Sequence, residues 1–186
     1  MSILSKGDLI KISQLFTSKR LPDIFIETGT FHGDTVDGVK SLFSEIHTFE
    51  LDKDLYEKAQ ERFRLQKNVH CHFQDSAKGL EELLSTISKP IVFWLDAHYA
   101  GPGTARGAEE IPLLRELEII GRRRYEDIII IDDVNNFGKR EKFEGDNDYR
   151  PHTYDWKSVS IKNIKNMLGW RANCILVFYP GNKLII

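Results

Sequence analysis

The chain has 186 residues, 41% of them hydrophobic and 29% charged, which suits one ordinary globular domain. Its formal net charge of −2 provides no basic field for nucleic acid, so we expect no nucleic-acid partner. Two cysteines outside any Cys-x-x-Cys pair, no secretory leader pattern and no membrane-length apolar run favour a cytoplasmic protein without a disulfide scaffold.

Hydrophobic periodicity predicts helices that alternate with strands along the chain. A helix is expected at about 7–19, a first strand at 24–27 and a second helix at about 34–43. Further strands are predicted at 46–51, 69–73, 91–96 and 127–133. The helices between them follow Asp52 or Asp54, start near Ala77, and span about 109–121. A polar segment at about 134–157 shows no periodicity and is interpreted as a long loop. A short helix at 158–168 and two strands, at 174–179 and 183–186, complete the chain.

This alternation predicts a single α/β domain over residues 1–186, built on a doubly wound, mostly parallel, seven-stranded sheet with right-handed crossovers. The last two strands are separated only by the turn signal Pro180-Gly181-Asn182. Because that connection is too short for a crossover, the C-terminal strand must be antiparallel.

The turn after the first strand is the clearest ligand-binding signal. Glu27 ends the strand, and Gly29 and Gly33 follow before a helix begins. Glycines allow the backbone to turn sharply and approach a ligand, and the N-terminus of a helix favours polar ligand groups. The dinucleotide fingerprint Gly-x-Gly-x-x-Gly is broken, however, because Phe31 stands at its second glycine. A purely structural turn remains an alternative.

Acidic residues end all five predicted parallel strands. In an open α/β sheet the carboxyl ends of parallel strands meet at one rim, where ligands bind. Carboxylates gathered there repel one another unless a ligand or cation separates them. The residues concerned are Glu27, Glu50, Asp75, Asp96 and the pair Asp132–Asp133.

Two of these acids suggest contacts with a nucleoside. Glu50 is placed to accept hydrogen bonds from both ribose hydroxyls, or is a surface acid or helix cap. Asp75 and Ser76 could bind an adenine edge, with the carboxylate accepting from the exocyclic amine and a backbone N–H donating to a ring nitrogen. Asp75 is equally suited to cap the helix that begins near Ala77, and the two roles are compatible.

The order of these motifs resembles that of the class I S-adenosylmethionine-dependent methyltransferases. Residues 27–33 resemble their first motif, 49–52 the second, 73–77 the third and 91–96 the fourth. The terminal hairpin resembles the family's antiparallel last strand, so the resemblance covers about 22–186. It implies S-adenosyl-L-methionine as cofactor, with contacts from Glu27, Gly29, Thr30, Phe31, Gly33, Thr35, Glu50, Leu51, Asp75, Ser76 and Asp96.

A narrower resemblance is to metal-dependent O-methyltransferases of the catechol, caffeoyl-coenzyme A and macrocin types. It implies Mg²⁺ bound by Asp96, Asp132 and Asp133, since Mg²⁺ prefers oxygen ligands. The pair could instead cap the next loop without a metal. His98 stands where the family pattern has other residues, and with Asp96 it is the candidate catalytic pair, His98 as general base. A structural or substrate-contact role for His98 is the alternative.

The expected function is therefore methyl transfer from S-adenosylmethionine to a hydroxyl of a small molecule. A nicotinamide-dependent oxidoreductase and a non-catalytic cofactor-binding protein are the alternatives, because the same kind of sheet serves all three. Aromatic residues of the long polar segment could line an acceptor pocket, form a homodimer surface or anchor the segment itself. They are Phe137, Phe143, Tyr149, Tyr154 and Trp156.

Overall fold

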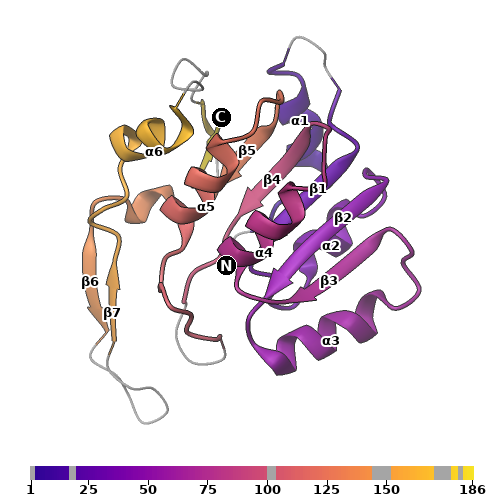
Figure 1. The fold of residues 1–186 in the computed structure, drawn as a ribbon, viewed down its shortest axis with the longest axis horizontal. Coiled ribbons are helices and arrows are strands. Elements are labelled where there is room, and N and C mark those ends of the chain that lie inside the picture. Colours follow the sequence, from indigo (N-terminus) through magenta and orange to yellow (C-terminus); the bar gives the residue numbers. More distant parts are fainter. Residues whose placement is uncertain (1–2, 17–19, 100–103, 144–151, 170–176, 180–181) are drawn as a thin grey trace.

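A computed structural model describes residues 3–16, 20–99, 104–143, 152–169, 177–179 and 182–186. Its main sheet has seven strands in the order β3-β2-β1-β4-β5-β9-β8 (Figure 1). The strands are β1 (Ile24–Thr28), β2 (Glu45–Glu50), β3 (Val69–Phe73), β4 (Ile91–Leu95), β5 (Ile128–Ile131), β8 (Val177–Tyr179) and β9 (Lys183–Ile185). Strands β1 to β5 pair in parallel, whereas β9 is antiparallel to both β5 and β8. The predicted fold class, including the antiparallel C-terminal strand, is confirmed.

The centre of the sheet consists of the most apolar strands. Every residue of β1, β4 and β5 is buried, as expected for parallel strands that are covered on both faces. Edge strand β3 is only partly buried, and its last residue, Phe73, is 51% exposed. The apolar runs in the sequence therefore identify the order of burial as well as the strands.

Helices cover both faces of this sheet (Figure 1). Helices α1 (Lys6–Ser13), α2 (Asp34–Val39) and α3 (Lys53–Phe63) contribute to the hydrophobic cluster on one face. The other face is covered by α4 (Ser76–Leu84), α5 (Leu113–Gly121) and α6 (Ile161–Leu168). Helix α4 packs very closely on β2, because a Cβ added to Gly79 would lie 2.2 Å from the ring of Phe49.

Four predicted helices are shorter than expected, and one of them, α6, begins at Ile161 after its N-cap Ser160 rather than at 158. Helix α1 ends at Ser13, where the backbone tightens into i→i+3 hydrogen bonds from Gln14 to Phe16. Helix α2 ends at Val39 in the same way, with Leu42 N–H donating to the Val39 carbonyl. Helix α5 begins only after Pro112, which suits the start of a helix because it has no N–H to donate.

The segment 134–157 is not one long loop, and this part of the prediction was wrong. It contains the short 3-10 helix η1 (Val134–Asn136) and an antiparallel pair of strands, β6 (Arg140–Phe143) and β7 (His152–Asp155). Strands of four residues, mostly polar, are too short to show a clear alternating pattern. In Figure 1 this hairpin extends away from the main sheet, at the lower left.

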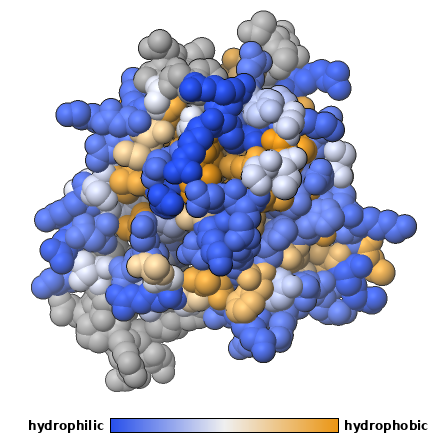
Figure 2. Space-filling view, in the orientation of Figure 1, coloured by the Kyte–Doolittle hydropathy of each residue, from blue (hydrophilic) through white to orange (hydrophobic). Residues whose placement is uncertain are grey.

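The described surface is mostly polar. Figure 2 shows a largely hydrophilic face with scattered hydrophobic areas. No helix within the described ranges has both the length and the apolar character needed to cross a membrane.

Candidate active site

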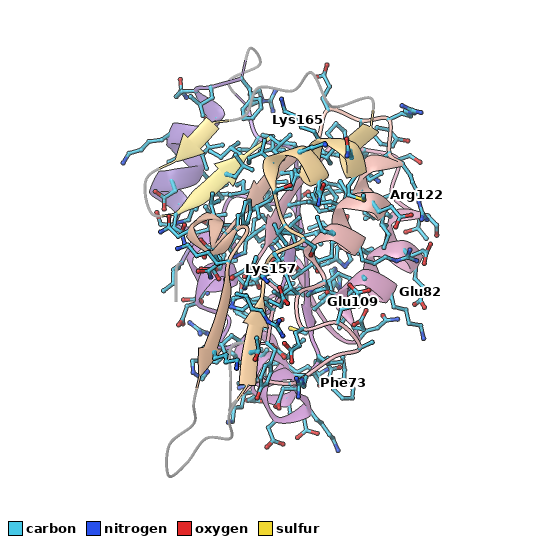
Figure 3. All side chains as sticks on the ribbon, turned by 90° about the vertical axis from the view of Figure 1, so that its left-hand side faces the viewer. Phe73, Glu82, Glu109, Arg122, Lys157 and Lys165 are labelled. Atoms are coloured by element: carbon cyan, nitrogen blue, oxygen red, sulfur yellow. The ribbon has the colours of Figure 1, made fainter. Side chains whose placement is uncertain are left out.

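A cavity of about 570 Å³ opens at the carboxyl ends of the parallel strands. In Figure 3, Phe73, which ends β3, lies toward the lower end of the molecule and Lys165 of α6 near the top, with Glu109, which lines the cavity, between them. The structure brings all but one of the predicted site residues to this cavity. They are Glu27, Gly29, Thr30, Phe31, Thr35, Glu50, Leu51, Asp75, Ser76, Asp96, His98, Asp132 and Asp133.

The exception is Gly33, which serves the turn rather than the cavity wall. It precedes α2 in the left-handed conformation, with φ of 79°, and a Cβ there would lie 2.8 Å from the ring of Phe63. Gly29 also has a positive φ, of 86°, and a Cβ there would lie 2.9 Å from the carbonyl oxygen of Asp96. Both glycines are therefore required by conformation and by space, and Gly29 lets the loops after β1 and β4 meet.

The N–H groups of this turn already have acceptors within the protein. The N–H groups of Gly29 and Thr30 both donate to the carbonyl of Phe49 at 3.1 Å. The N–H of Phe31 donates to the carboxylate of Glu50 at 2.8 Å, and the N–H of Gly33 donates to the carbonyl of Thr30, within the turn, at 2.8 Å. A turn that has used these donors is a poor cradle for a pyrophosphate.

Phe31 adopts a conformation that normally requires glycine. Its φ of 48° lies in the left-handed region, at a cost of about 1–2 kcal/mol for a residue with a Cβ. The hydrogen bond from Phe31 N–H to Glu50 Oε2 holds the residue there. The position of the missing fingerprint glycine is thus kept in glycine-like geometry, with an aromatic ring added to the cavity wall.

Glu27 is buried at the base of the cavity, with 1% of its surface exposed. The hydroxyl of Thr48 donates to Glu27 Oε2 at 2.6 Å. Burial raises the pKa of Glu27 to about 8 in spite of this donor, and the nearby charge of Glu50 adds to the effect. This carboxyl would therefore gain from a cationic ligand group that reaches the base of the cavity.

Glu50 connects the glycine turn to the end of β2. Its Oε2 accepts from Phe31 N–H, and its Oε1 accepts from the N–H groups of Leu51 and Asp52, both at 2.9 Å. Burial raises the pKa of Glu50, although these three donors oppose the shift. A carboxylate offers about four acceptor positions, so one remains on Oε2.

The corner formed by Asp75 and Ser76 has the helix-capping role foreseen for it. Asp75 caps α4 by accepting from the N–H of Lys78 at 3.1 Å, and its other oxygen lies near Gly107, where a Cβ would be 3.4 Å away. The hydroxyl of Ser76 donates to Glu116 Oε1 at 2.6 Å. Ser76 therefore presents its hydroxyl to the protein, which the sequence did not indicate.

Opposite this corner lies an acidic cluster that contains a histidine. Donor atoms of Asp96, His98 and Asp133 all lie within 4.8 Å of one another. His98 Nε2 is 3.4 Å from Asp133 Oδ2, and His98 Nδ1 is 3.9 Å from Asp96 Oδ1. Asp132 lines the same cavity and is 3% exposed. The three donors that converge thus include His98, whereas the expected set had Asp132 in its place.

The charges in this cluster perturb one another. Burial raises the pKa of Asp96 to about 9, and the charges of Asp132, Asp133 and Glu27 add to the shift. Burial lowers the pKa of His98, although Asp133 opposes that shift. The histidine is therefore disposed to be neutral, and the carboxyl of Asp96 gains most from a neighbouring cation.

Sequence reasoning missed one residue that supports this cluster, Asn182, and foresaw a second, Trp156, as an aromatic residue that could line the pocket. Asn182, in the turn before β9, donates to Asp133 Oδ1 at 3.4 Å and accepts from the N–H of Asn135 at 2.6 Å. Trp156 is 5% exposed, lines the cavity and packs edge-on against His98 with ring centroids 5.6 Å apart. Of the other aromatics foreseen there, Tyr149 and the side chains of Phe143 and Tyr154 lie outside the described part.

Comparisons with known proteins give matches in structure only. No protein-family model matches the chain, and no curated protein matches it in sequence. The O-methyltransferase TomG from Streptomyces achromogenes, involved in tomaymycin synthesis and solved with SAM, is 16% identical, with 99% of this chain and 81% of that chain covered and a TM-score of 0.56. The sugar N-methyltransferase KedS8 from Streptoalloteichus is 10% identical, with 97% and 85% covered and a TM-score of 0.57.

The chain also spans 60% of the length of the 23S rRNA methyltransferase ErmE, with 77% of this chain covered, 12% identity and a TM-score of 0.46. Identities of this size describe shared architecture. The strand order, the antiparallel β9 and the two matches above 0.5 agree. The chain therefore has the fold of the class I S-adenosylmethionine-dependent methyltransferases.

Proposed function

We propose that the protein is an S-adenosylmethionine-dependent methyltransferase that acts on a hydroxyl group of a small molecule, with a divalent cation beside the acceptor. The observation that carries the proposal is the chemistry of the glycine turn. Its N–H groups are committed to Phe49 and Glu50, and the carboxyl of Glu27 lies below it. Such a site offers a pyrophosphate few free N–H donors, and its buried carboxyl gains from a ligand with a cationic centre.

The residues present fit the parts of that cofactor. Glu27 favours the positive charge of the sulfonium and amino groups, and the absence of a Cβ at Gly29 leaves the wall open. The remaining acceptor position on Glu50 Oε2 suits one ribose hydroxyl rather than two. The free oxygen of Asp75 suits an exocyclic amine of adenine. When bound, the cofactor supplies a methyl group that is already activated on a sulfonium sulfur.

His98 is the residue we assign as general base. It lines the cavity between two carboxylates and is held against Trp156, and its lowered pKa keeps the imidazole neutral and able to accept a proton. With the cofactor bound, His98 would take the proton of the acceptor hydroxyl while the methyl–sulfur bond breaks, the methyl–oxygen bond forms and the sulfur leaves as a neutral thioether. The contribution of the protein is mainly alignment of the two reacting groups in a shared cavity.

A divalent cation fits the carboxylates of the cluster that contains His98. Asp96 and Asp133 offer carboxylate oxygens that converge, and Asp132 lines the same cavity; burial and, to a smaller extent, the neighbouring charges raise the pKa of Asp96, so this carboxyl gains from a nearby cation. A cation there would lower the pKa of an acceptor hydroxyl. Because His98 Nε2 also converges on Asp133, a cation that accepts nitrogen ligands, such as Mn²⁺, could bind there too, but it would occupy the proposed base, whereas Mg²⁺ bound by carboxylates alone would leave His98 free to accept a proton.

The cofactor and the cation are tested by ligand-induced thermal stabilisation. We expect S-adenosylhomocysteine to raise the melting temperature and NAD⁺ to leave it unchanged. A shift with NAD⁺ and none with S-adenosylhomocysteine would contradict the assignment. For the cation, Mn²⁺ and Mg²⁺ are titrated against wild type and Asp133→Asn, with the exposed Asp54→Asn as control. Equal stabilisation of the Asp133→Asn variant would remove the cation from the proposal.

A further inference from the structure

Glu116 is a fully buried carboxyl that neither the sequence motifs nor the proposed chemistry accounts for. It lies on α5 with 0% exposure, and burial raises its pKa to about 7, with the charges of Asp75 and Glu109 adding to the effect. Leu113, Leu117 and Ile120 on the same helix are all buried in the hydrophobic core. An apolar side chain would pack there without the cost of burying a carboxyl.

The contacts of Glu116 join two parts of the cavity wall. Oε1 accepts from the hydroxyl of Ser76 at 2.6 Å, at the first residue of α4. Oε2 accepts from the hydroxyl of Thr28 at 3.5 Å, at the last residue of β1 and directly before Gly29. One side chain thus connects the corner after β3 with the start of the glycine turn.

The same helix also carries the segment that covers this end of the cavity. Gly107 lies in that segment, and a Cβ there would meet Leu51 at 3.2 Å and Asp75 Oδ2 at 3.4 Å. The segment reaches α5 through Glu109 and Pro112, and both of these residues line the cavity. Helix α5 therefore reaches the end of the cavity beside Asp75 in two ways: through the segment 107–112 that precedes it, and through Glu116, which accepts from the hydroxyls of Ser76 and Thr28.

We propose that Glu116 is a positioning residue for the nucleoside part of the cofactor, acting through the hydroxyl of Ser76 to fix the corner formed by Asp75 and Ser76. The proposal rests on the proposed function, since it presumes that the cavity binds S-adenosylmethionine. It assigns no contact between Glu116 and the cofactor itself. The hydroxyl of Ser76 is used in its hydrogen bond to Glu116. The corner therefore offers a ligand the free oxygen of Asp75 and the backbone, and the bond to Glu116 holds both in place.

A double-mutant cycle read by calorimetric titration of S-adenosylhomocysteine tests this role. We expect Glu116→Leu, which keeps the volume and loses the acceptor, to weaken binding about tenfold. Ser76→Ala should weaken binding similarly. The affinity of the double variant should be no more than about twofold below that of whichever single variant binds less tightly. Glu116→Gln should restore binding to within about twofold of wild type, because the amide can still pair with the Ser76 hydroxyl.

The matched control is Glu118→Gln on the same helix. The Glu118 side chain pairs with Arg115 and Arg122 at the surface, so this variant should bind S-adenosylhomocysteine like wild type. Unchanged affinity in both Glu116→Leu and Ser76→Ala would overturn the positioning role while leaving the cofactor assignment intact. Additive losses in the cycle would also overturn it. Absence of binding by wild type would instead overturn the proposed function and, with it, this role. If Glu116→Leu does not fold, the comparison of Ser76→Ala with Glu116→Gln decides: equal affinity in the two variants contradicts the proposal.

Discussion

Glu116→Gln should remove one contribution to the pH dependence of the protein's stability, that of the Glu116 carboxyl. The ordinary pKa of 4.5 is raised to about 7 in the folded protein, mainly by burial. The folded state therefore holds the Glu116 proton more tightly than the unfolded state. The stability that this proton contributes is fully present below about pH 4.5 and is lost as pH rises through about 7.

The magnitude follows from the two pKa values. A shift from 4.5 to about 7 corresponds to about 3 kcal/mol in the free energy of unfolding, of which about 2 kcal/mol is lost between about pH 5.5 and 8.5. Glutamine has nearly the same shape and no titration, so the variant should lose about 2 kcal/mol less over that range. Glu27 and Asp96 also have raised pKa values, but their contribution is common to both proteins and cancels in the comparison.

Urea unfolding of wild type and Glu116→Gln at both pH values measures this difference. With a typical urea dependence of about 2 kcal/mol per M, the midpoint of wild type should fall by about 1 M more than that of the variant. Glu118→Gln, at a partly exposed position of the same helix, should follow wild type. Parallel pH dependence of wild type and Glu116→Gln would refute the reasoning, because it would mean that the buried carboxyl does not titrate as its surroundings require.

Further predictions concern packing and chemistry. Gly79→Ala should destabilise the protein by about 1–3 kcal/mol, as measured by urea unfolding, because the new methyl group would stand 2.2 Å from the ring of Phe49. A free energy of unfolding within about 0.5 kcal/mol of wild type would contradict the close contact between α4 and β2. His98→Gln should lower the rate of methyl transfer at least about 100-fold in a single-turnover assay. Its affinity for S-adenosylhomocysteine, measured by calorimetry, should be unchanged. An unchanged rate would remove His98 as the base.

The arrangement of the sheet follows closely from the sequence. The continuous apolar runs at 91–95 and 128–131 predict central strands, and an acid after each strand predicts a polar rim at one end. The short link between β8 and β9 predicts the antiparallel pair, which the structure contains. Local pattern and chain geometry decide these features, so they can be derived before any contact is known.

The contacts that fix the site could not be derived in the same way. Phe31 has a positive φ because Glu50 holds its N–H, a long-range contact that leaves no mark on local propensity. Asn182 reaches Asp133 from a turn 49 residues away. Glu116 did leave a signal, since it falls on the apolar stripe of α5 between buried residues three before and four after it, but a single glutamate in a helix is normally interpreted as solvent-exposed.

Titration calorimetry of S-adenosylhomocysteine into wild type and Gly29→Ala tests the central claim most directly. Wild type should bind one molecule per chain. Gly29→Ala should not bind detectably, because alanine at φ 86° is strained and its Cβ would stand 2.9 Å from the backbone oxygen of Asp96, which displaces the cavity wall. Absence of binding by folded wild type, or equal binding by Gly29→Ala, would contradict the assignment of this cavity to S-adenosylmethionine.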